Sequence, residues 1–360
     1  MYLPPVTHVA GLLTIRRERR LPAHGEILVR PGDRVEANDV VGRAPRNTRH
    51  RILDVARQLR IEPAAADSLL RVDAGVALKK GATLAEKRTL GLFRRRVRVP
   101  FDGEVIAAGD GRLLMASRDH PFELRAFLPG TVVDIQSSRS VLIEAHGVLI
   151  QAKWGSGRKA FGVLRVAATD PTQPLLAQSI DVGYQDVIVA VGGAVDHEAL
   201  QAAAAAHVRG IVAGSMPGEL IDFARGLPFP VLITEGFGER IMPAYSWELL
   251  IEHNGRETAL DANPTDRFAG SRPELIIPLP TMEPPPPVPV EGEPLVIGKR
   301  VRMLRKPHAG EIGVIVEIGA QQQRFASGLL GFAVTVELDD GAAVVAPRNN
   351  VEVYEDSLPA

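Results

Sequence analysis

The residues with the clearest potential for binding lie near the C-terminus of this sequence. Residues 299–306 mix basic and apolar side chains, which alternate from 300 to 303, and an extended strand places alternate side chains on opposite faces. Basic side chains on the face turned away from the protein core can contact phosphates or an acidic protein surface. We therefore predict that a protein or RNA partner contacts Lys299, Arg300, Arg302, Arg305, Lys306 and His308.

A second group of candidate residues follows three apolar segments in the middle of the chain, at 186–191, 211–213 and 231–233. Apolar strands that alternate with helices predict a βαβαβ unit with a parallel sheet. Ligands of such sheets bind at the carboxyl ends of the strands. The predicted ligand rim comprises Gly192, Gly193, Gly214, Ser215, Glu235 and Gly236. Tight strand-to-helix turns also need glycine, so both interpretations stay open.

No spacing of residues identifies a catalytic or metal site. Ser215 lacks the flanking glycines of a hydrolase nucleophile, so we interpret it as a helix cap. Asp196 and His197 are adjacent and would point in different directions on a helix, so a helix cap again explains Asp196. The absence of cysteine excludes disulfides and thiolate ligands. We expect no catalytic residue, no metal and no cofactor.

Composition indicates a globular protein of two or three domains. The 360 residues are 45% hydrophobic and 24% charged. Residues 1–165 contain 29 Lys and Arg against 17 Asp and Glu, whereas residues 166–360 contain 13 against 26. Three interpretations of the basic half are open: it binds phosphates or an acidic partner, it forms a solvated face, or it docks onto the acidic half of the same chain. The sequence shows neither a signal peptide nor a membrane-spanning apolar run, so we expect a cytoplasmic protein without membrane contact.

The first 150 residues repeat a hairpin pattern of apolar strand, glycine turn and apolar strand, at 27–42, 70–81, 97–106 and 124–133. These segments resemble the barrel-sandwich hybrid of biotinyl and lipoyl domains in its non-carrier form. Lys79 and Lys80 stand outside the sequence context that carrier domains use, so we expect no covalent biotin or lipoate.

Residues 297–316 resemble the KOW motif of ribosomal proteins and elongation factors. The resemblance rests on Gly298, Val301, Pro307, Gly310, Gly313, Val314 and Ile315. It implies an SH3-like β-barrel that binds RNA or protein. His308 stands where the family usually has an aromatic side chain, and residues 295–355 carry seven basic and seven acidic residues, which favours a protein partner.

The predicted fold class is a multidomain β plus α/β protein. Its parts are a barrel-sandwich-like β domain at 1–168 with an inserted helix at 47–62, a parallel α/β domain at 180–279, a Pro-rich linker at 280–294 and an SH3-like barrel at 295–356. The predicted function is that of a non-enzymatic cytoplasmic adaptor or scaffold that binds its partner through the barrel. One alternative is an enzyme or small-molecule sensor that uses the glycine-rich rim, and another is an RNA-associated factor in transcription or translation.

Overall fold

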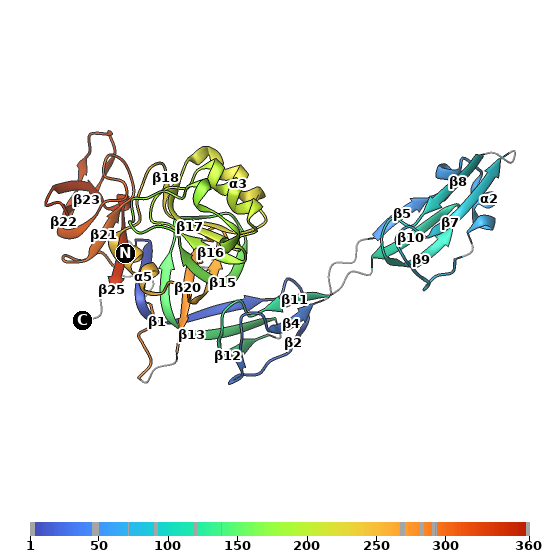
Figure 1. Cartoon of the computed structure of the whole chain (residues 1–360), viewed down its shortest axis with the longest axis horizontal. Helices are drawn as coiled ribbons and strands as arrows, with labels where there is room; N and C mark the ends of the chain where they lie inside the picture. Colours follow the sequence, from blue (N-terminus) through green and yellow to red (C-terminus); the bar gives the residue numbers. More distant parts are fainter. Residues whose placement is uncertain are drawn as a thin grey trace.

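The computed structural model of this chain is a multidomain, β-rich protein with a large mixed sheet. It describes residues 4–44, 50–70, 72–89, 93–117, 121–137, 139–266, 271–280, 284–289, 292 and 294–357. Strands account for 48% of the described residues and helices for 15%. The positions of candidate functional side chains are therefore set mainly by sheets (Figure 1).

Two long antiparallel strands, β1 (Val6–Arg20) and β13 (Ser140–Gln151), form the spine of the molecule. They pair along most of their length, with an irregularity between Ala10 and Leu13. One half of the spine carries a small β domain, and the other half is continuous with the α/β part and the C-terminal strands (Figure 1). The spine therefore joins the separate hydrophobic cores of the protein.

The N-terminal β domain packs around the spine at its Arg20 end. Its other strands are β2 (Glu26–Ile27), β3 (Arg34–Val35), β4 (Val40–Ala44), β11 (Phe122–Arg125) and β12 (Gly130–Gln136). Leu21, Val41, Val132 and Ile143 are among its core residues. Gly32 has φ +93°, a conformation that suits glycine in the turn after Pro31.

Residues 50–117 form a separate unit, here called the inserted lobe, with its own core around Val97, Val105 and Leu113. Its elements are β5 (His50–Asp54), α1 (Val55–Leu59), α2 (Pro63–Leu69), β6 (Ala77–Leu78), β7 (Thr83–Thr89), β8 (Phe93–Arg98), β9 (Gly103–Gly109) and β10 (Arg112–Ser117). One sheet has the strand order β5-β10-β9-β6, and β7 pairs with β8 in the other.

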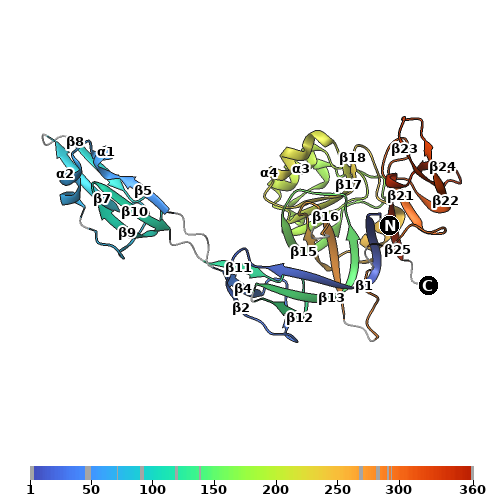
Figure 2. The ribbon, with the colours of Figure 1, turned by 180° about the vertical axis from the view of Figure 1, so that it is seen from behind.

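The structure differs from the single β domain predicted over 1–168. The cores of the inserted lobe and the N-terminal β domain share no residue, and Figures 1 and 2 show the lobe set apart from the rest of the protein. The helix predicted over 47–62 is shorter than expected. It begins only at Val55, because residues 50–54 pair with β10 as a strand, and it ends at Leu59, because Arg60 takes a left-handed conformation; residues 47–49 lie outside the described residues. Both units are built from the same type of hairpin, so the pattern alone does not separate them.

The α/β part contains the predicted alternation of strands and helices. Its elements are β14 (Trp154–Gly155), β15 (Lys159–Val166), β16 (Val187–Ala190), α3 (His197–Ala205), β17 (Gly210–Met216), α4 (Ile221–Gly226), β18 (Val231–Phe237), α5 (Ala244–Glu252), β19 (Glu257–Asp261) and β20 (Glu274–Leu279). Strands β15 to β18 are parallel and adjacent in chain order. Strand β15, which the prediction placed in the N-terminal domain, therefore belongs to this sheet.

The remaining helices are short. The 3-10 helices are η1 (Ala177–Ser179), η2 (Val182–Tyr184), η3 (Gly218–Leu220) and η4 (Arg348–Asn350). Among the helices of the described residues, none has the length and apolar character needed to cross a membrane.

The C-terminal β domain, residues 294–357, continues the large sheet. Its strands are β21 (Arg300–Met303), β22 (Ile312–Arg324), β23 (Leu330–Leu338), β24 (Ala343–Pro347) and β25 (Val351–Ser357). Val301, Ile315 and Val336 are completely buried in its core. Strand β25 pairs antiparallel with β21 and parallel with β1, so the first and last strands of the chain are neighbours (Figure 1).

The described part of the Pro-rich segment, residues 284–289, lies against the spine. Thr14 donates its backbone N–H to the carbonyl of Pro287 at 2.9 Å and its hydroxyl to the carbonyl of Pro286 at 2.6 Å. Pro286 is buried. This stretch is therefore anchored to β1 rather than standing free between two domains.

Candidate functional site

One buried arginine connects the C-terminal β domain to the α/β part. Arg302, on β21, is only 1% exposed. Its Nε donates to Glu352 Oε1 at 2.7 Å, and its Nη1 donates to Glu235 Oε2 at 2.9 Å. Its guanidinium also lies 5.0 Å from the ring centroid of Tyr354. Because Glu352 is on β25 and Glu235 is on β18, Arg302 connects two strands that are far apart in the sheet order.

Two further cations share the carboxylate of Glu352. Lys153 Nζ lies 3.8 Å from Glu352 Oε1, and Arg272 Nη1 lies 3.6 Å from Glu352 Oε2. Three cations thus face two carboxylates, which leaves a surplus positive charge at a largely buried position. We call this group the junction cluster; its members are Lys153, Glu235, Arg272, Arg302 and Glu352.

The charges of the junction cluster shift the pKa values of its members. Burial lowers the pKa of Arg302, but the carboxylates of Glu235 and Glu352 outweigh burial and raise this pKa above its ordinary value. Burial raises the pKa of Glu352, but the neighbouring cations, Arg302 first, lower it below its ordinary value. Both groups of this ion pair are therefore held in their charged forms.

Lys153 is the member of the cluster that loses its proton more easily than usual. Burial is the main cause that lowers its pKa to about 8, and the positive charge of Arg302 lowers it further. Glu352 and Glu235 oppose this shift without cancelling it. A lysine with such a pKa gains electrostatic stabilisation when an anion binds beside it.

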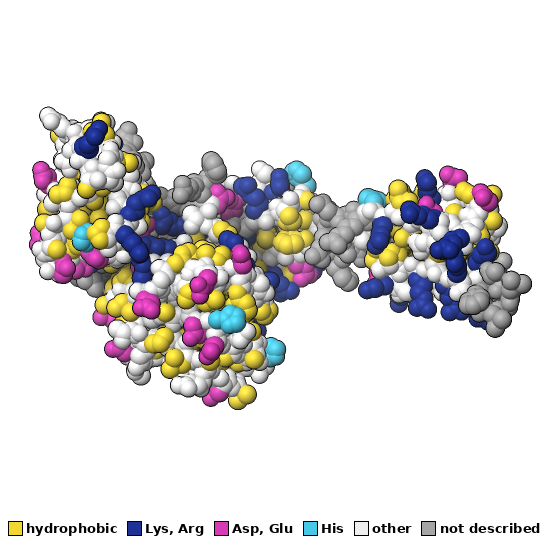
Figure 3. Space-filling view, turned by 90° about the horizontal axis from the view of Figure 1, so that it is seen from above, with side chains coloured by type: hydrophobic (Ala, Val, Ile, Leu, Met, Phe, Trp, Pro, Cys, Tyr) yellow, Lys and Arg dark blue, Asp and Glu magenta, His cyan; other side chains and the backbone are white. Residues whose placement is uncertain are grey.

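An open cleft of about 970 Å³ lies beside the junction cluster. Its walls come from the N-terminal segment, the connection between β13 and β14, residues 265–266 and 271–272, and the C-terminal β domain. Lys153, Arg272 and Glu352 line the cleft, together with His8, Asp266 and Arg305. Figure 3 shows Lys and Arg side chains gathered where the C-terminal β domain meets the α/β part. We call this space the junction cleft.

The basic residues predicted to contact a partner do not form one exposed surface. The prediction that Arg302 is available to a partner is wrong, because the α/β part covers the face of β21 on which its side chain lies. Arg305 and Lys306 are exposed, whereas Lys299, Arg300 and His308 are half-buried. The carboxylates of Asp339 and Glu311 pair with two of these half-buried side chains, Arg300 at 3.0 Å and His308 at 2.8 Å respectively.

The predicted ligand rim is filled by its own chain. A Cβ added to Gly192 would lie 2.6 Å from Pro171, and one added to Gly193 would lie 2.5 Å from the carbonyl oxygen of Gln173. A Cβ on Gly214 would approach the carbonyl oxygen of Gly192 to 2.1 Å. These glycines therefore permit close contact between backbone segments, and the rim is not open to a ligand at these positions.

The polar residues of the rim also have partners within the protein. The hydroxyl of Ser215 donates to the carbonyl oxygen of Arg240 at 2.8 Å and accepts from its backbone N–H at 3.0 Å. Ser215 lies within β17, so the expected helix cap is wrong. Gly236 is buried at φ +90°, and the carboxylate of Glu235 is committed to Arg302. The two predicted sites, on β21 and on β18, therefore meet each other.

Lys153 and Arg272 were absent from the sequence-based site, as was Glu352. Lys153 lies two residues after the end of β13, and a charge just beyond a buried strand is a weak signal. Glu352 and Arg272 stand in segments with no distinctive spacing. These three residues come together only because the segment after β13, residues 271–272 and β25 meet at the cleft.

The expected cap at Asp196 is confirmed, because its side chain accepts from Ala199 N at 2.8 Å at the start of α3. Within the described ranges, no group of three or more His, Asp or Glu side chains is arranged to hold a metal ion.

The comparisons with known proteins assign no family to this arrangement. No family model matches the chain, and no curated protein matches its sequence.

Proposed function

We propose that this protein is a binding protein for a small anionic molecule, which it holds in the junction cleft. The observation that carries the proposal is the charge of the cleft lining, where the cations Lys153, Arg272 and Arg305 outnumber the carboxylates Asp266 and Glu352. Like charges close together in a poorly solvated place repel one another, so an anion in the cleft would stabilise the folded protein. The sequence predicts a small-molecule site at the glycine-rich rim. We propose that the small molecule binds in the junction cleft instead.

The lining groups favour a ligand with a carboxylate or phosphate. Arg272 Nη1 donates to the hydroxyl of Thr7 at 2.7 Å, so an anion would bind the other N–H groups of this guanidinium, and Lys153 adds a point charge beside it. The volume of about 970 Å³ is at the upper end of the range for small-molecule sites. The ligand therefore has room for a body larger than its anionic group.

Thermal unfolding of the full chain with pyrophosphate, citrate or glucose tests this proposal. We expect the two anions to raise the melting temperature, because they bind only the folded state, and glucose to have no effect. Lys153→Gln should abolish the rise. Lys159→Gln is the matched control, since Lys159 is paired with Asp261 at 2.6 Å outside the cleft.

Two outcomes would overturn the proposal. One is a melting temperature that neither anion raises. The other is an equal rise in the wild type and in both lysine variants, which would indicate a general salt effect rather than binding in the cleft.

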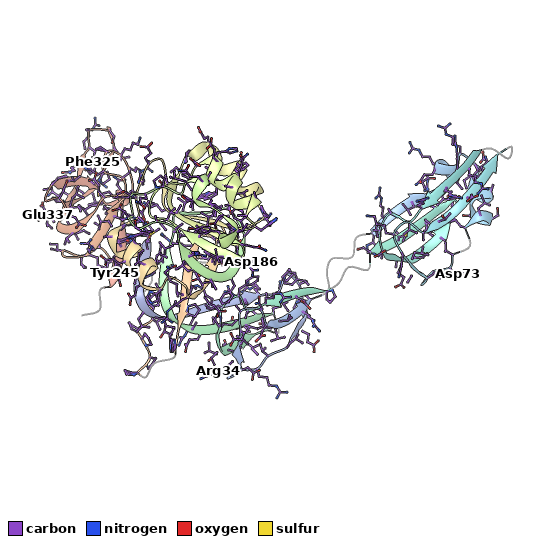
Figure 4. All side chains as sticks on the ribbon, in the orientation of Figure 1. Arg34, Asp73, Asp186, Tyr245, Phe325 and Glu337 are labelled. Carbon is purple, nitrogen blue, oxygen red and sulfur yellow. The ribbon has the colours of Figure 1, made fainter. Side chains whose placement is uncertain are left out.

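The C-terminal β domain supports a second proposal, that of an adaptor with a protein partner. Leu329 is 54% exposed and Leu330 is 62% exposed, at the end of the β22–β23 hairpin. Phe325, labelled in Figure 4, lies at the same end of the domain. Exposed apolar side chains in a group favour contact with another protein surface.

Cross-linking in native lysate tests the adaptor proposal with the pair Leu329→Ser and Leu330→Ser. We expect this pair to lose a specific cross-linked protein, whereas Ile52→Ser, a change at another exposed apolar residue in the inserted lobe, should retain it. Identical cross-linked products in all three proteins would exclude this surface.

A further inference from the structure

The inserted lobe carries a regular row of arginines on β8. Arg94, Arg96 and Arg98 are exposed, whereas Val97 is 1% exposed and belongs to the lobe core. Alternate residues of a strand share a face and are separated by roughly 6.7 Å along it. The three arginine side chains therefore project from one face of β8 at a regular spacing.

Two lysines extend this row. Lys79 and Lys80 are exposed in the turn before β7. This turn lies beside the end of β8, because Gly81 donates its backbone N–H to the carbonyl of Val99 at 2.8 Å. We call Lys79, Lys80, Arg94, Arg96 and Arg98 the basic row.

The carboxylates near the basic row neutralise only part of its charge. Glu86 Oε2 accepts from Arg96 Nε at 2.6 Å, and Glu86 Oε1 lies 3.9 Å from Arg94 Nε. Asp102 accepts from the backbone N–H of Lys80. The lobe as a whole, residues 50–117, has 13 Lys and Arg against eight Asp and Glu. The row therefore keeps a net positive charge.

The position of the lobe leaves this charge available to a partner. Figures 1 and 2 show the lobe beyond the N-terminal β domain, at the far end from the α/β part. Figure 3 shows Lys and Arg side chains gathered along one side of the lobe. The described structure thus does not dock the row onto the acidic half of the chain, which the sequence analysis left open.

We propose that the basic row binds the phosphate backbone of a nucleic acid. Its regular spacing is similar to the separation of successive phosphates along a nucleic-acid strand, and arginine binds phosphate well. A membrane surface is less suited, because the exposed apolar residues Ile52 and Ile106 lie on β5 and β9, in the other sheet. Contacts to the backbone alone do not read sequence, so the binding is non-sequence-specific. This activity is separate from the junction cleft and shares no residue with it.

Fluorescence anisotropy of the full chain with a labelled 20-nucleotide strand and a 20-base-pair duplex tests the proposal. The logarithm of the binding constant should fall linearly with the logarithm of salt concentration. For about four phosphate contacts the slope is about −3 for a single strand and about −4 for a duplex. The form with the higher affinity identifies the natural type of ligand.

The variant Arg94→Gln with Arg98→Gln should make this slope shallower by about 1.5, because two phosphate contacts are lost. It retains the pair between Arg96 and Glu86. The control is Arg51→Gln with Arg112→Gln, which removes the same charge from strands of the other sheet. The control slope should stay within about 0.5 of the wild type. Hydrogen exchange of the β7 and β8 amides establishes that the lobe stays folded.

Three results would overturn the proposal. The first is an absence of binding at low salt. The second is an equal change of slope in the control, which would show an effect of net charge alone. The third is tighter binding to polyglutamate or to anionic vesicles than to nucleic acid, which would assign the row to an acidic protein or a membrane.

Discussion

Strands β21 and β8 have similar sequences but different environments. Each places an arginine next to an apolar core residue: Arg302 follows Val301 on β21, and Arg96 precedes Val97 on β8. Arg302 is 1% exposed and paired with two carboxylates, whereas Arg96 is exposed and paired with one. In each strand the arginine side chain lies on the face that is turned away from the core of its own unit. The difference arises because the α/β part covers β21, while the described structure places no second domain over β8.

The comparison shows what strand periodicity can predict. Alternation determines which face a side chain takes relative to the core of its own sheet. It does not determine whether a second domain covers that face. A basic strand can therefore serve as a binding surface or as a buried connection between domains.

We expect the largest loss of stability from Arg302→Met. This change distinguishes a buried connection between domains from an exposed binding surface. Removing the guanidinium leaves the carboxylates of Glu235 and Glu352 buried without their main partner, which should cost about 3–5 kcal/mol. The exposed counterpart, Arg98→Met, should cost less than about 0.5 kcal/mol. Hydrogen exchange of the β25 and β8 amides measures the two free energies of opening. Equal costs at the two sites would show that the junction is not held by this ion pair.

The next effect concerns pH and Lys153. Its pKa in the folded state is about 8 against 10.5 ordinarily, so between these values the unfolded chain binds a proton that the folded protein does not. Stability should therefore rise as pH increases from 8 to 10.5, by about 3 kcal/mol from this group. Urea denaturation of the wild type and of Lys153→Met over this range measures the difference. A variant with the same slope as the wild type would contradict the lowered pKa.

A conservative change tests whether the geometry of Arg302 matters in addition to its charge. Arg302→Lys keeps the charge but cannot reach both carboxylates with the planar arrangement of a guanidinium. The loss of a charged hydrogen bond should cost about 2 kcal/mol, less than the change to Met. Hydrogen exchange of the β25 amides again provides the measurement. A lysine variant as stable as the wild type would mean that charge alone holds the junction.

The smallest effect is expected on β8. Arg96→Gln removes a pair with Glu86 that is exposed to solvent, and such pairs contribute about 0–1 kcal/mol. The β7 and β8 amides should therefore exchange at nearly wild-type rates, while nucleic-acid affinity decreases. Strong destabilisation of the lobe by this single change would show that the arginine has a structural role similar to that of Arg302.

Several elements could be predicted from the sequence because their signals are local. The apolar segments around Val189 and Val212 are buried on both faces. A helix separates them in the chain, so a parallel pairing can be predicted from the alternation of apolar strand and helix, and the two strands do pair in parallel. Asp196 can be predicted as a cap because aspartate directly before a helix accepts a hydrogen bond from a backbone group of the first turn, here that of Ala199. Each of these features depends on neighbours along the chain.

Other features depend on contacts between distant segments. The inserted lobe has the same hairpin pattern as the domain that carries it, so only the separate cores reveal two units. Val353 lies beside Val6 in the sheet, and no local signal indicates that the first and last strands of the chain pair.

Strand alternation and the order of strands and helices between residues 186 and 233 can be predicted from the sequence. Tertiary contacts are needed to show that Arg302 is buried, that Glu235 faces it from β18, and that Lys153 and Arg272 line a cleft beside them. This difference reflects the range of the interactions. Side-chain alternation and helix capping act over a few residues, whereas the ion pairs of Arg302 join residues 50 and 67 positions apart in the chain.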